Sequence, residues 1–421
     1  MMALDEGCFA SPQTGTHQIA VSLGTVENLN VSIRQNWADV RGDWQAIMAR
    51  FQTCPFQDTR WKDAWFHTGG SSRNACSLFV VLHEGPDLVG VLPLYKRQFA
   101  GHNVLAWQGD DVNDYCVPLL APHLQKALSS EACEEILRRV AQHVGGVHAL
   151  LLRGQPTLVR GGQNPFAHIG NYQDTGIAHY LLLAGPWQPF YAALRGKNTR
   201  RRLSQKLRKL KNHGTVRFKG LRRTDDRLKA LDLMLTWKAN QLDERGSRNP
   251  FRTLRGEKTI LTRQLEAVVG KPESCASVRL YGLFVGDQMI AGFLCLTQNG
   301  DFSVLINAYD KEAYSEHSPG QLLLVQTMEL ATRAGMTSYD LMRGDEPYKR
   351  EWVRDHTILK DSVVPLTFRG KALKKLHHLI QSGKRAALQR PRMMAFLHAA
   401  NRRRGRLVRF FSEGKGRSEA L

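Results

Sequence analysis

The sequence predicts an α/β protein that consists of two copies of one arrangement, followed by a basic helical tail. Each copy is expected to be a mixed, largely antiparallel sheet covered by helices. Three observations support this prediction. Short runs of apolar, β-branched residues alternate with segments of helical periodicity, the two halves of the chain repeat one order of elements, and the basic residues gather in two segments.

The chain has 421 residues, of which 42% are hydrophobic. That is enough for two globular domains with cores of their own. We expect a disordered lead-in, a first domain, a second domain and a tail, at 1–39, 40–185, 186–368 and 369–421. No stretch reaches the roughly 18 consecutive apolar residues of a membrane-spanning helix, and the N-terminal segment lacks the basic cluster that opens a secretory signal.

The cysteines indicate a reducing compartment. Seven of them are scattered along the chain, and none forms a C-x-x-C pair. An odd, widely spaced set argues against a disulfide framework and against a zinc site. We therefore expect no metal and a cytoplasmic location.

The first domain opens with helical segments at 44–50 and 59–66, the second of which carries three aromatic residues. Apolar runs then predict four strands, at 77–83, 88–95, 104–107 and 114–119. The turn EGPD between the first two strands is a hairpin signal. A helix at 130–144, ended by two glycines, leads into a strand at 147–152.

The second domain repeats this order without visible sequence identity. Three strands joined by glycine-containing turns are expected at 278–285, 288–297 and 302–309. The next helix runs from Pro319, which suits a first helical position, to about Ala334, with Gly335 as a left-handed stop. Strands at 337–342 and 362–367 follow. Two unrelated α/β domains are the alternative to a tandem repeat.

Two segments of the second domain resemble a known family. The run SPGQLL at 318–323 and the run YDLMRGDEPYKREW at 339–352 resemble the signature of the CelD-like GNAT acyltransferases, which are named for cellulose biosynthesis. The segments 190–212 and 51–65 are also similar to that family, so the resemblance covers most of residues 40–368. FemAB-type aminoacyltransferases are more distantly similar and have the same tandem build. The resemblance implies tandem GNAT-like domains and acyl transfer from acetyl-CoA or another acyl-CoA.

The resemblance also implies where the donor binds. In GNAT enzymes a strand, a loop and a helix N-terminus bind the donor pyrophosphate, because free N–H groups and the helix dipole favour an anion. The expected donor-binding residues are Asn307, Ala308, Ser318, Gly320, Gln321 and Leu322, and backbone N–H groups near the first two should face the thioester oxygen. This loop has one glycine, and Pro319 lacks an N–H donor. An acyl carrier protein therefore stays open as the donor, and an ordinary capped helix start is the structural alternative.

Three residues are candidates for the chemistry, which requires a deprotonated amine held against the thioester. Asp340 lies among apolar strand neighbours, so burial should raise its pKa toward that of a general base, with Lys349 as the compensating cation. Tyr348 is the candidate proton donor to the departing thiolate. A structural pair of Asp340 with Lys349 or Arg343 is the alternative.

The acceptor is expected to be an amine. Glu346 would attract it, and Tyr309 lies at the same mouth. Arg200 and Arg201 belong to a helix within the segment 195–219, which has eleven Lys and Arg and no acid. Such a surface suits a polyanionic acceptor, a lipid-linked phosphosugar or the phosphates of the donor.

The tail is the second basic segment, with fifteen Lys and Arg against two acids. Leu373, Leu376 and Ile380 are spaced as one helical stripe, and aromatic residues lie between later basic clusters. This pattern favours an interfacial helix on an anionic membrane leaflet. Nucleic-acid binding is the rival, but the sequence has no helix-turn-helix spacing and no aromatic RNA-binding signature.

We therefore predict an N-acyltransferase, foremost an acetyltransferase, that acts on a small amine, an amino sugar or an envelope polysaccharide precursor. It is expected in the cytoplasm, at the inner face of the membrane. A non-catalytic GNAT-like scaffold of a polysaccharide synthesis complex and a nucleic-acid-binding protein are the alternatives.

Overall fold

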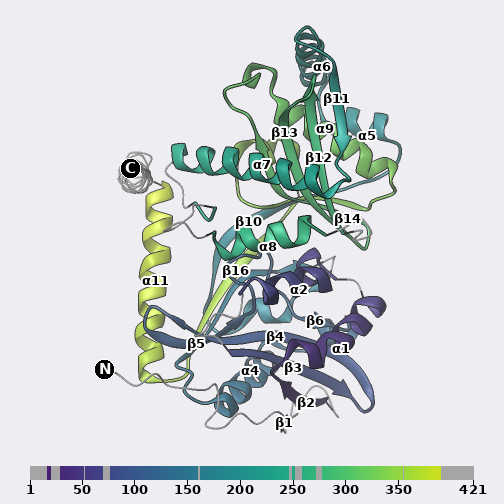
Figure 1. The fold of residues 1–421 in the computed structure, drawn as a ribbon. Helices are drawn as coiled ribbons and strands as arrows, with labels where there is room; N and C mark the ends of the chain where they lie inside the picture. Colours follow the sequence, from purple (N-terminus) through teal and green to yellow (C-terminus); the bar gives the residue numbers. More distant parts are fainter. Residues whose placement is uncertain are drawn as a thin grey trace, which may run out of the picture. The chain divides into compact units, whose positions relative to one another are not determined.

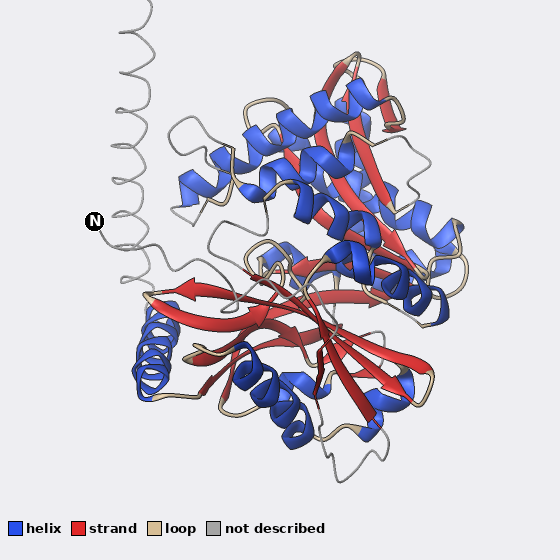
Figure 2. Ribbon diagram, turned by 60° about the horizontal axis from the view of Figure 1, so that its bottom comes forward, coloured by secondary structure: helices blue, strands red, loops and turns tan. Residues whose placement is uncertain are grey.

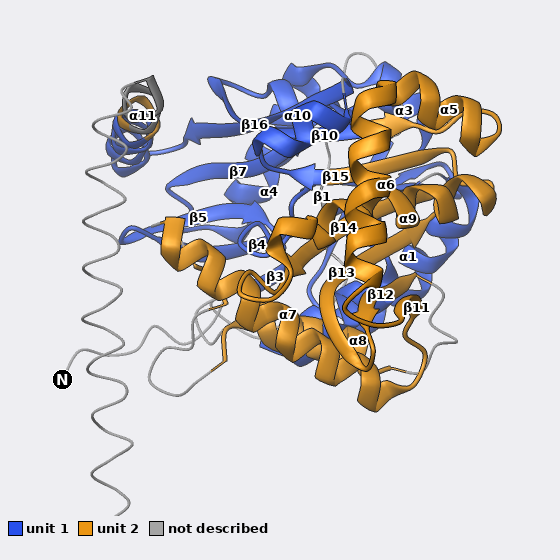
Figure 3. Cartoon of the chain, turned by 90° about the horizontal axis from the view of Figure 1, so that it is seen from above, with its two compact units in different colours: residues 1–180, 342–380 blue, residues 181–341, 381–421 orange. Residues whose placement is uncertain are grey.

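The computed structural model groups the chain into two compact units, residues 1–180 with 342–380 and residues 181–341 with 381–421 (Figures 1 and 3). The structure describes residues 17–19, 29–51, 53–69, 76–159, 162–245, 249–251, 258–271, 277–353 and 355–389. The predicted lead-in before residue 17 and the tail beyond residue 389 lie outside these ranges. No helix among the described residues combines the length and hydropathy that a membrane span needs.

Unit 1 is built on one sheet with the strand order β1-β2-β3-β4-β5-β7-β16-β10, in which β6 pairs with β4. Its strands are β1 His17–Ile19, β2 Leu29–Arg34, β3 Cys76–Glu84, β4 Asp87–Phe99, β5 His102–Trp107, β6 Leu119–Leu120, β7 Ala149–Pro156, most of β10 Tyr172–Leu182, and β16 Asp355–Pro365. A short hairpin of β8 Leu158–Val159 and β9 Gly162–Gln163 is separate. Its helices are α1 Trp37–Arg50, η1 Pro55–Gln57, α2 Thr59–His67, α3 Pro122–Ala127, α4 Ser130–Val144, η2 Pro165–His168, α10 Pro347–Trp352 and most of α11 Phe368–Gln389.

Helices cover both faces of this sheet (Figure 2). Leu78, Val80 and Leu82 of β3 pack in one core with α4, whereas Phe79 and Val81 pack in another with α1. Successive strand residues point to opposite faces, so α4 and α1 lie on opposite sides of the sheet.

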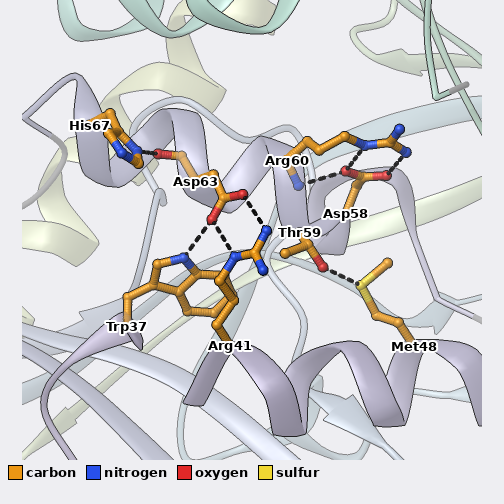
Figure 4. Close-up of polar contacts among 8 residues, drawn as sticks. All are labelled: Trp37, Arg41, Met48, Asp58, Thr59, Arg60, Asp63 and His67. Atoms are coloured by element: carbon orange, nitrogen blue, oxygen red, sulfur yellow. Dashed lines mark hydrogen bonds and ion pairs between the residues drawn. The ribbon is translucent and has the colours of Figure 1, made fainter. Parts of the chain in front are cut away.

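Polar contacts fix α1 against α2 within unit 1 (Figure 4). The Asp63 carboxylate accepts hydrogen bonds from Trp37 Nε1 at 2.7 Å and from Arg41 at 3.0 and 3.1 Å. Asp58 caps α2 by accepting from the Arg60 N–H at 2.8 Å. These contacts hold the aromatic face of α2, which the sequence predicted, against the core.

Unit 2 has the strand order β15-β14-β13-β12-β11. Its strands are β11 Val216–Gly220, β12 Val278–Val285, β13 Gln288–Gln298, β14 Asp301–Tyr309 and most of β15 Ser338–Arg343. Its helices are α5 Trp187–Leu194, α6 Lys197–Lys211, α7 Thr224–Arg245, α8 Ile260–Val269, η3 Ser315–His317 and α9 Pro319–Arg333.

The predicted tandem arrangement is present. Unit 1 runs β2, α1, α2, β3, β4, β5, α4, β7, and unit 2 runs β11, α7, α8, β12, β13, β14, α9, β15. In each unit the helix before the last of these strands joins two parallel neighbours, β5 with β7 and β14 with β15, while the other ladders are antiparallel. This is the α/β tandem fold that the sequence predicted.

The boundaries differ from those predicted in three places. Residues 29–34 form β2 and α1 begins at Trp37, although the lead-in was expected to reach residue 39, because β2 alternates Leu29, Val31 and Ile33 into the core and pairs with β3. Residues 342–368 belong to unit 1 instead of the second domain, since β16 pairs antiparallel with both β7 and β10. The strand expected at 114–119 is reduced to the two residues of β6.

The cysteines follow the prediction in part. Cys54, Cys116, Cys133 and Cys295 are buried free thiols. Cys76 takes part in a disulfide, which the spacing of the cysteines did not lead us to expect.

Candidate active site

The candidate site in unit 2 begins where two parallel strands diverge. β14 and β15 pair only at Asp301–Ser303 with Ser338–Asp340. Beyond Ser303, the ladder between these two strands stops, so one edge of β14 is left open within unit 2.

A β-bulge lies at the start of the open edge. Leu294 and Cys295 of β13 pair with Ile306 and Val304, so Leu305 is the additional residue on β14. A bulge bends its strand and redirects the backbone groups that follow it. The corresponding ladder of unit 1, between β4 and β5, has no such shift in register. The feature therefore distinguishes the two halves, and nothing in the sequence indicated it.

The ladder also determines which backbone groups face the open edge. The Asp310 N–H donates to Ile290 O at 3.0 Å, which makes Tyr309 and Ala291 a non-hydrogen-bonded pair of the antiparallel ladder. Asn307 is two residues earlier, so the N–H and C=O of Asn307 and Tyr309 point away from β13. Those of Ala308 point toward β13. Of the two predicted N–H donors, Asn307 is placed to face the opening and Ala308 is not.

Helix α7 supplies side chains to this edge. Lys238 Nζ donates to Asn307 O at 3.1 Å and to Asn307 Oδ1 at 2.9 Å, and Gln241 Nε2 donates to Tyr309 O at 3.2 Å. The two residues are three positions apart and so share one face of α7. Sequence reasoning missed both, because helical spacing does not tell which polar residue meets a strand edge.

The start of α9 differs from an ordinary anion-binding helix N-terminus. Ser318 has a left-handed backbone at φ 53, and its N–H donates to Ser315 O at 3.0 Å. The N–H groups of Gln321 and Leu322 donate to Ser318 O at 3.0 and 3.1 Å. Pro319 has no N–H, so Gly320 holds the N–H of this turn that is left for a ligand, as far as the described residues show.

Side chains and close packing complete this corner of unit 2. Lys206 of α6 donates to Ser318 Oγ at 2.6 Å. A Cβ on Gly320 would lie 3.3 Å from Cδ1 of Tyr309, so the glycine allows the α9 start to approach the end of β14. His317, which is buried, has its Nε2 3.3 Å from Nε2 of His213.

Charge favours the α9 start over the matching helix start of unit 1 as the anion site. The first turn of α9 carries no acid, and Lys206 contacts its N-cap residue. The first turn of α4 carries Glu131, whose pKa is lowered by hydrogen bonds from the backbone and from Ser129. The α4 start is therefore already stabilised by a carboxylate of the protein.

The predicted substrate residues on α6 are less involved than their neighbour Lys206. Arg201 is exposed, and Arg200 Nε donates to Arg195 O at 3.0 Å. Leu203 and Leu210 form the buried side of α6, as predicted, while Leu207 is partly buried.

Asp340 lies on β15 beside Ser303 of β14. Its neighbour Tyr339 is buried, and the Tyr339 hydroxyl lies 2.7 Å from Thr327 Oγ1 of α9. Since side chains alternate along a strand, Asp340 points to the face of β15 opposite to α9. The position is partly buried, which suits a group that exchanges protons.

The other predicted catalytic and acidic residues belong to unit 1. Lys349 is buried in α10 and donates to Met342 O at 3.2 Å and to Arg343 O at 2.8 Å, and it forms an ion pair with Glu346 at 3.1 Å. Lys349, which we predicted from the sequence as the compensating cation of Asp340, thus forms an ion pair with Glu346. Tyr348, also on α10, is partly buried.

A second acid, Asp114, lies near this group in unit 1. Burial raises the pKa of Asp114, and the nearby Lys349 and Arg343 oppose that shift. Lys349 thereby belongs to a buried polar cluster at the end of β15, where Met342 has φ 60 and Gly344 has φ 126. In the part of the chain that the structure describes, no group of three or more His, Cys, Asp or Glu side chains could hold a metal ion.

Comparisons with known proteins agree with this geometry. Residues 197–350, from the first residue of α6 into α10, match the family model of the GNAT acetyltransferase domain. In fold the chain is similar to FemX, at 10% identity over 81% of this chain and 98% of that one, with a TM-score of 0.54. It is also similar to the C-terminal domain of a putative lysylphosphatidylglycerol synthetase from Agrobacterium fabrum, at 11% identity over 82% of this chain and 97% of that one, with a TM-score of 0.50.

No curated protein sequence matches the chain. The family match rests on the segment that carries the divergent strands, the bulge and the α9 start, and the two solved structures share the fold. The chain therefore contains a GNAT acetyltransferase domain, and it is an acyltransferase of the GNAT type.

Proposed function

We propose that unit 2 transfers an acyl group, foremost acetyl, from acyl-CoA to an amine. The observation that carries this proposal is the open edge of β14, which follows the bulge at Leu305 and ends beside the α9 start. Unit 1 has the same element order, but it lacks the bulge and has an acid in the first turn of α4.

The residues at this edge fit an acyl-CoA donor. Gly320 leaves room against Tyr309, and Lys206 brings a cation to the α9 start. The Asn307 N–H would bind the acyl arm, and Ser318, Gly320 and Lys206 would hold the phosphates. When bound, acyl-CoA supplies an activated acyl group. Because few backbone donors are left at the α9 start, an acyl carrier protein with its single phosphate is the second donor to test.

Asp340 is the proposed general base for the amine. It points to the face opposite to α9, and it is partly buried. A base must be deprotonated at working pH and within reach of the amine proton. Lys238 acts on the same strand edge as a positioning residue, since its contacts with Asn307 hold the backbone that would receive the acyl arm.

We further propose an amino sugar or an amine-bearing envelope polysaccharide precursor as the acceptor. The similarity of 318–323 and 339–352 to the CelD-like family supports this choice. Within unit 1, Glu346 stays paired with Lys349.

Hydrogen exchange with and without acetyl-CoA tests the donor site. We expect protection of 304–323, which covers the open part of β14 and the α9 start. Calorimetric titrations with acetyl-CoA, CoA and an acyl carrier protein identify the donor. Protection of 104–132 with no change at 304–323 would place the donor in unit 1, and the absence of binding by all three donors would support a scaffold.

We also propose that α11 contacts an anionic membrane surface on the cytoplasmic side. Phe368 and Leu379 are 86% and 68% exposed, and Leu376 and Ile380 are exposed as well. Lys371 and Lys375 lie exposed between them. Leu373, which the sequence placed on the apolar stripe with Leu376 and Ile380, is instead buried in a core of unit 1.

The membrane contact is best tested without truncation, since removing α11 would expose the core around Leu373. In a sedimentation assay, the amount of the variant Phe368→Gln/Leu379→Gln/Ile380→Gln that sediments with phosphatidylserine vesicles should be about tenfold lower than that of the parent. High salt should weaken the parent only in part, because apolar contacts do not depend on charge. Unchanged vesicle binding of the variant would exclude α11 as the contact.

A further inference from the structure

A groove of about 720 Å³ lies in unit 2 beside α7, apart from the open edge of β14. One wall is a single face of α7, on which Asp226, Lys229, Leu233 and Trp237 recur at spacings of three or four residues. The other wall comes from the end of β11, the β12–β13 hairpin and Asp310. Figure 1 shows α7 crossing in front of β12 and β13.

The charges in this groove leave an anion-binding end. Asp287 is paired with Arg217 at 2.7 Å, and Asp310 Oδ1 accepts from the N–H groups of Glu312 and Ala313 at 3.0 and 3.1 Å. Arg223 and Lys229 are exposed, and neither has an ion-pair partner among the described residues. Asp226, the third acid of the lining, is exposed on the same face of α7, but Lys219 and Arg222 also line the groove, so its cations outnumber its acids. An incoming anion would therefore be attracted to Arg223 and Lys229.

The middle of the groove is apolar. Leu233 is 44% exposed, and Trp237 and Phe284 are further lining residues. An exposed leucine beside aromatic rings suits the alkyl chain or the ring face of a ligand.

Two lining residues of the groove are sequence neighbours of residues at the proposed reacting edge. Asp310 follows Tyr309 on β14, and Trp237 precedes Lys238, which contacts Asn307. Along α7, Lys229 and Lys238 are separated by about 13 Å, since each helical residue advances about 1.5 Å. A ligand with its amine at Asn307 could thus place a second group near Lys229.

We infer that this groove binds the far end of the acceptor, and that the acceptor is an amine with a phosphate or carboxylate several bonds away. Arg223 and Lys229 would bind the anion, and Leu233 and Trp237 would contact the part between anion and amine. This inference rests on the proposed acyl transfer in unit 2, and it adds the chemical class of the acceptor.

A series of ω-aminoalkyl phosphates and carboxylates of increasing length, with plain alkylamines as references, serves as the probe. In acetyl-CoA turnover, KM should fall as the chain becomes long enough to reach the two cations. The variant Arg223→Gln/Lys229→Gln should raise KM for the long anionic amines about tenfold, with kcat nearly unchanged and the alkylamines unaffected. The control Arg263→Gln/Arg333→Gln removes two exposed cations of unit 2 outside the groove. It should change neither KM nor kcat for any of these amines.

Calorimetric binding of the longest anionic amine, without acetyl-CoA, separates the two hypotheses. If the parent binds this probe, the groove variant does not, and no amine is acetylated, the groove is supported and the acyl transfer is refuted. If amines are acetylated with the same KM by the parent and the groove variant, and both bind the probe equally, the proposed role of the groove is refuted. Near-UV circular dichroism confirms that each variant is folded.

Discussion

Lys238 and Asn307 are joined by two hydrogen bonds from one ammonium group, 3.1 Å to the backbone carbonyl oxygen and 2.9 Å to the side-chain Oδ1. The contact ties the middle of α7 to the strand residue whose N–H faces the open edge of β14. One helix therefore holds the proposed donor edge and, on its adjoining face, lines the groove proposed for the acceptor.

Replacement of this lysine tests the positioning role. Lys238→Met keeps most of the side-chain volume but removes both bonds. We expect kcat/KM to fall about tenfold or more, because a hydrogen bond from a charged donor contributes about 1.5–3 kcal/mol. Lys311→Met, which removes an exposed lysine paired with Glu244, is the matched control and should leave kcat/KM unchanged. A Lys238 variant with parental kinetics would refute the role.

Enlargement of Gly320 tests the close approach of α9 to β14. A Cβ there meets the Tyr309 ring at 3.3 Å, and the branches of a valine would extend further into that space. We expect Gly320→Val to weaken acetyl-CoA binding about tenfold in calorimetry, with a smaller effect for alanine. Gly286→Ala, at a hairpin turn with φ 59, serves as a control for general destabilisation. Parental affinity in the valine variant would place the donor elsewhere.

Removal of the Asp340 charge tests the proposed base. Asp340→Asn should lower kcat while leaving the Kd for acetyl-CoA almost unchanged, because the carboxylate would act on the amine and not on the donor. A variant that unfolds, or one with full kcat, would instead assign Asp340 a structural place beside Ser303.

The ion pair of Lys349 with Glu346 is predicted to stabilise unit 1. Lys349→Met leaves Glu346 and two backbone carbonyls without their partner, and it should lower the free energy of unfolding by on the order of 3 kcal/mol. The double variant Lys349→Met/Glu346→Gln should recover part of that loss, because the carboxylate that pairs with Lys349 is then removed as well. Urea unfolding measures both values. A fully stable Lys349→Met protein without activity would return this lysine to the chemistry.

The order of the elements and much of their extent could be predicted from the amino-acid sequence. The β3–β4 and β12–β13 hairpins turn at Gly85 and Gly286, which have φ 55 and φ 59, and α9 starts at Pro319. These features depend on residues near one another in the chain, where turn chemistry and helical spacing act directly. The repeated order then indicated the tandem fold.

The details of the site depend on contacts that form only when the chain has folded. The bulge at Leu305 exists because β13 and β14 differ by one residue in register, and the orientation of Asn307 follows from that ladder. Lys238 reaches Asn307 across 69 residues of chain, and β16 returns to unit 1 to pair with β7 and β10. Such contacts join residues that are distant in sequence, and their selection depends on how whole faces pack. Local patterns could therefore locate the strand and helix of the donor site, but they could not tell which side chains meet there.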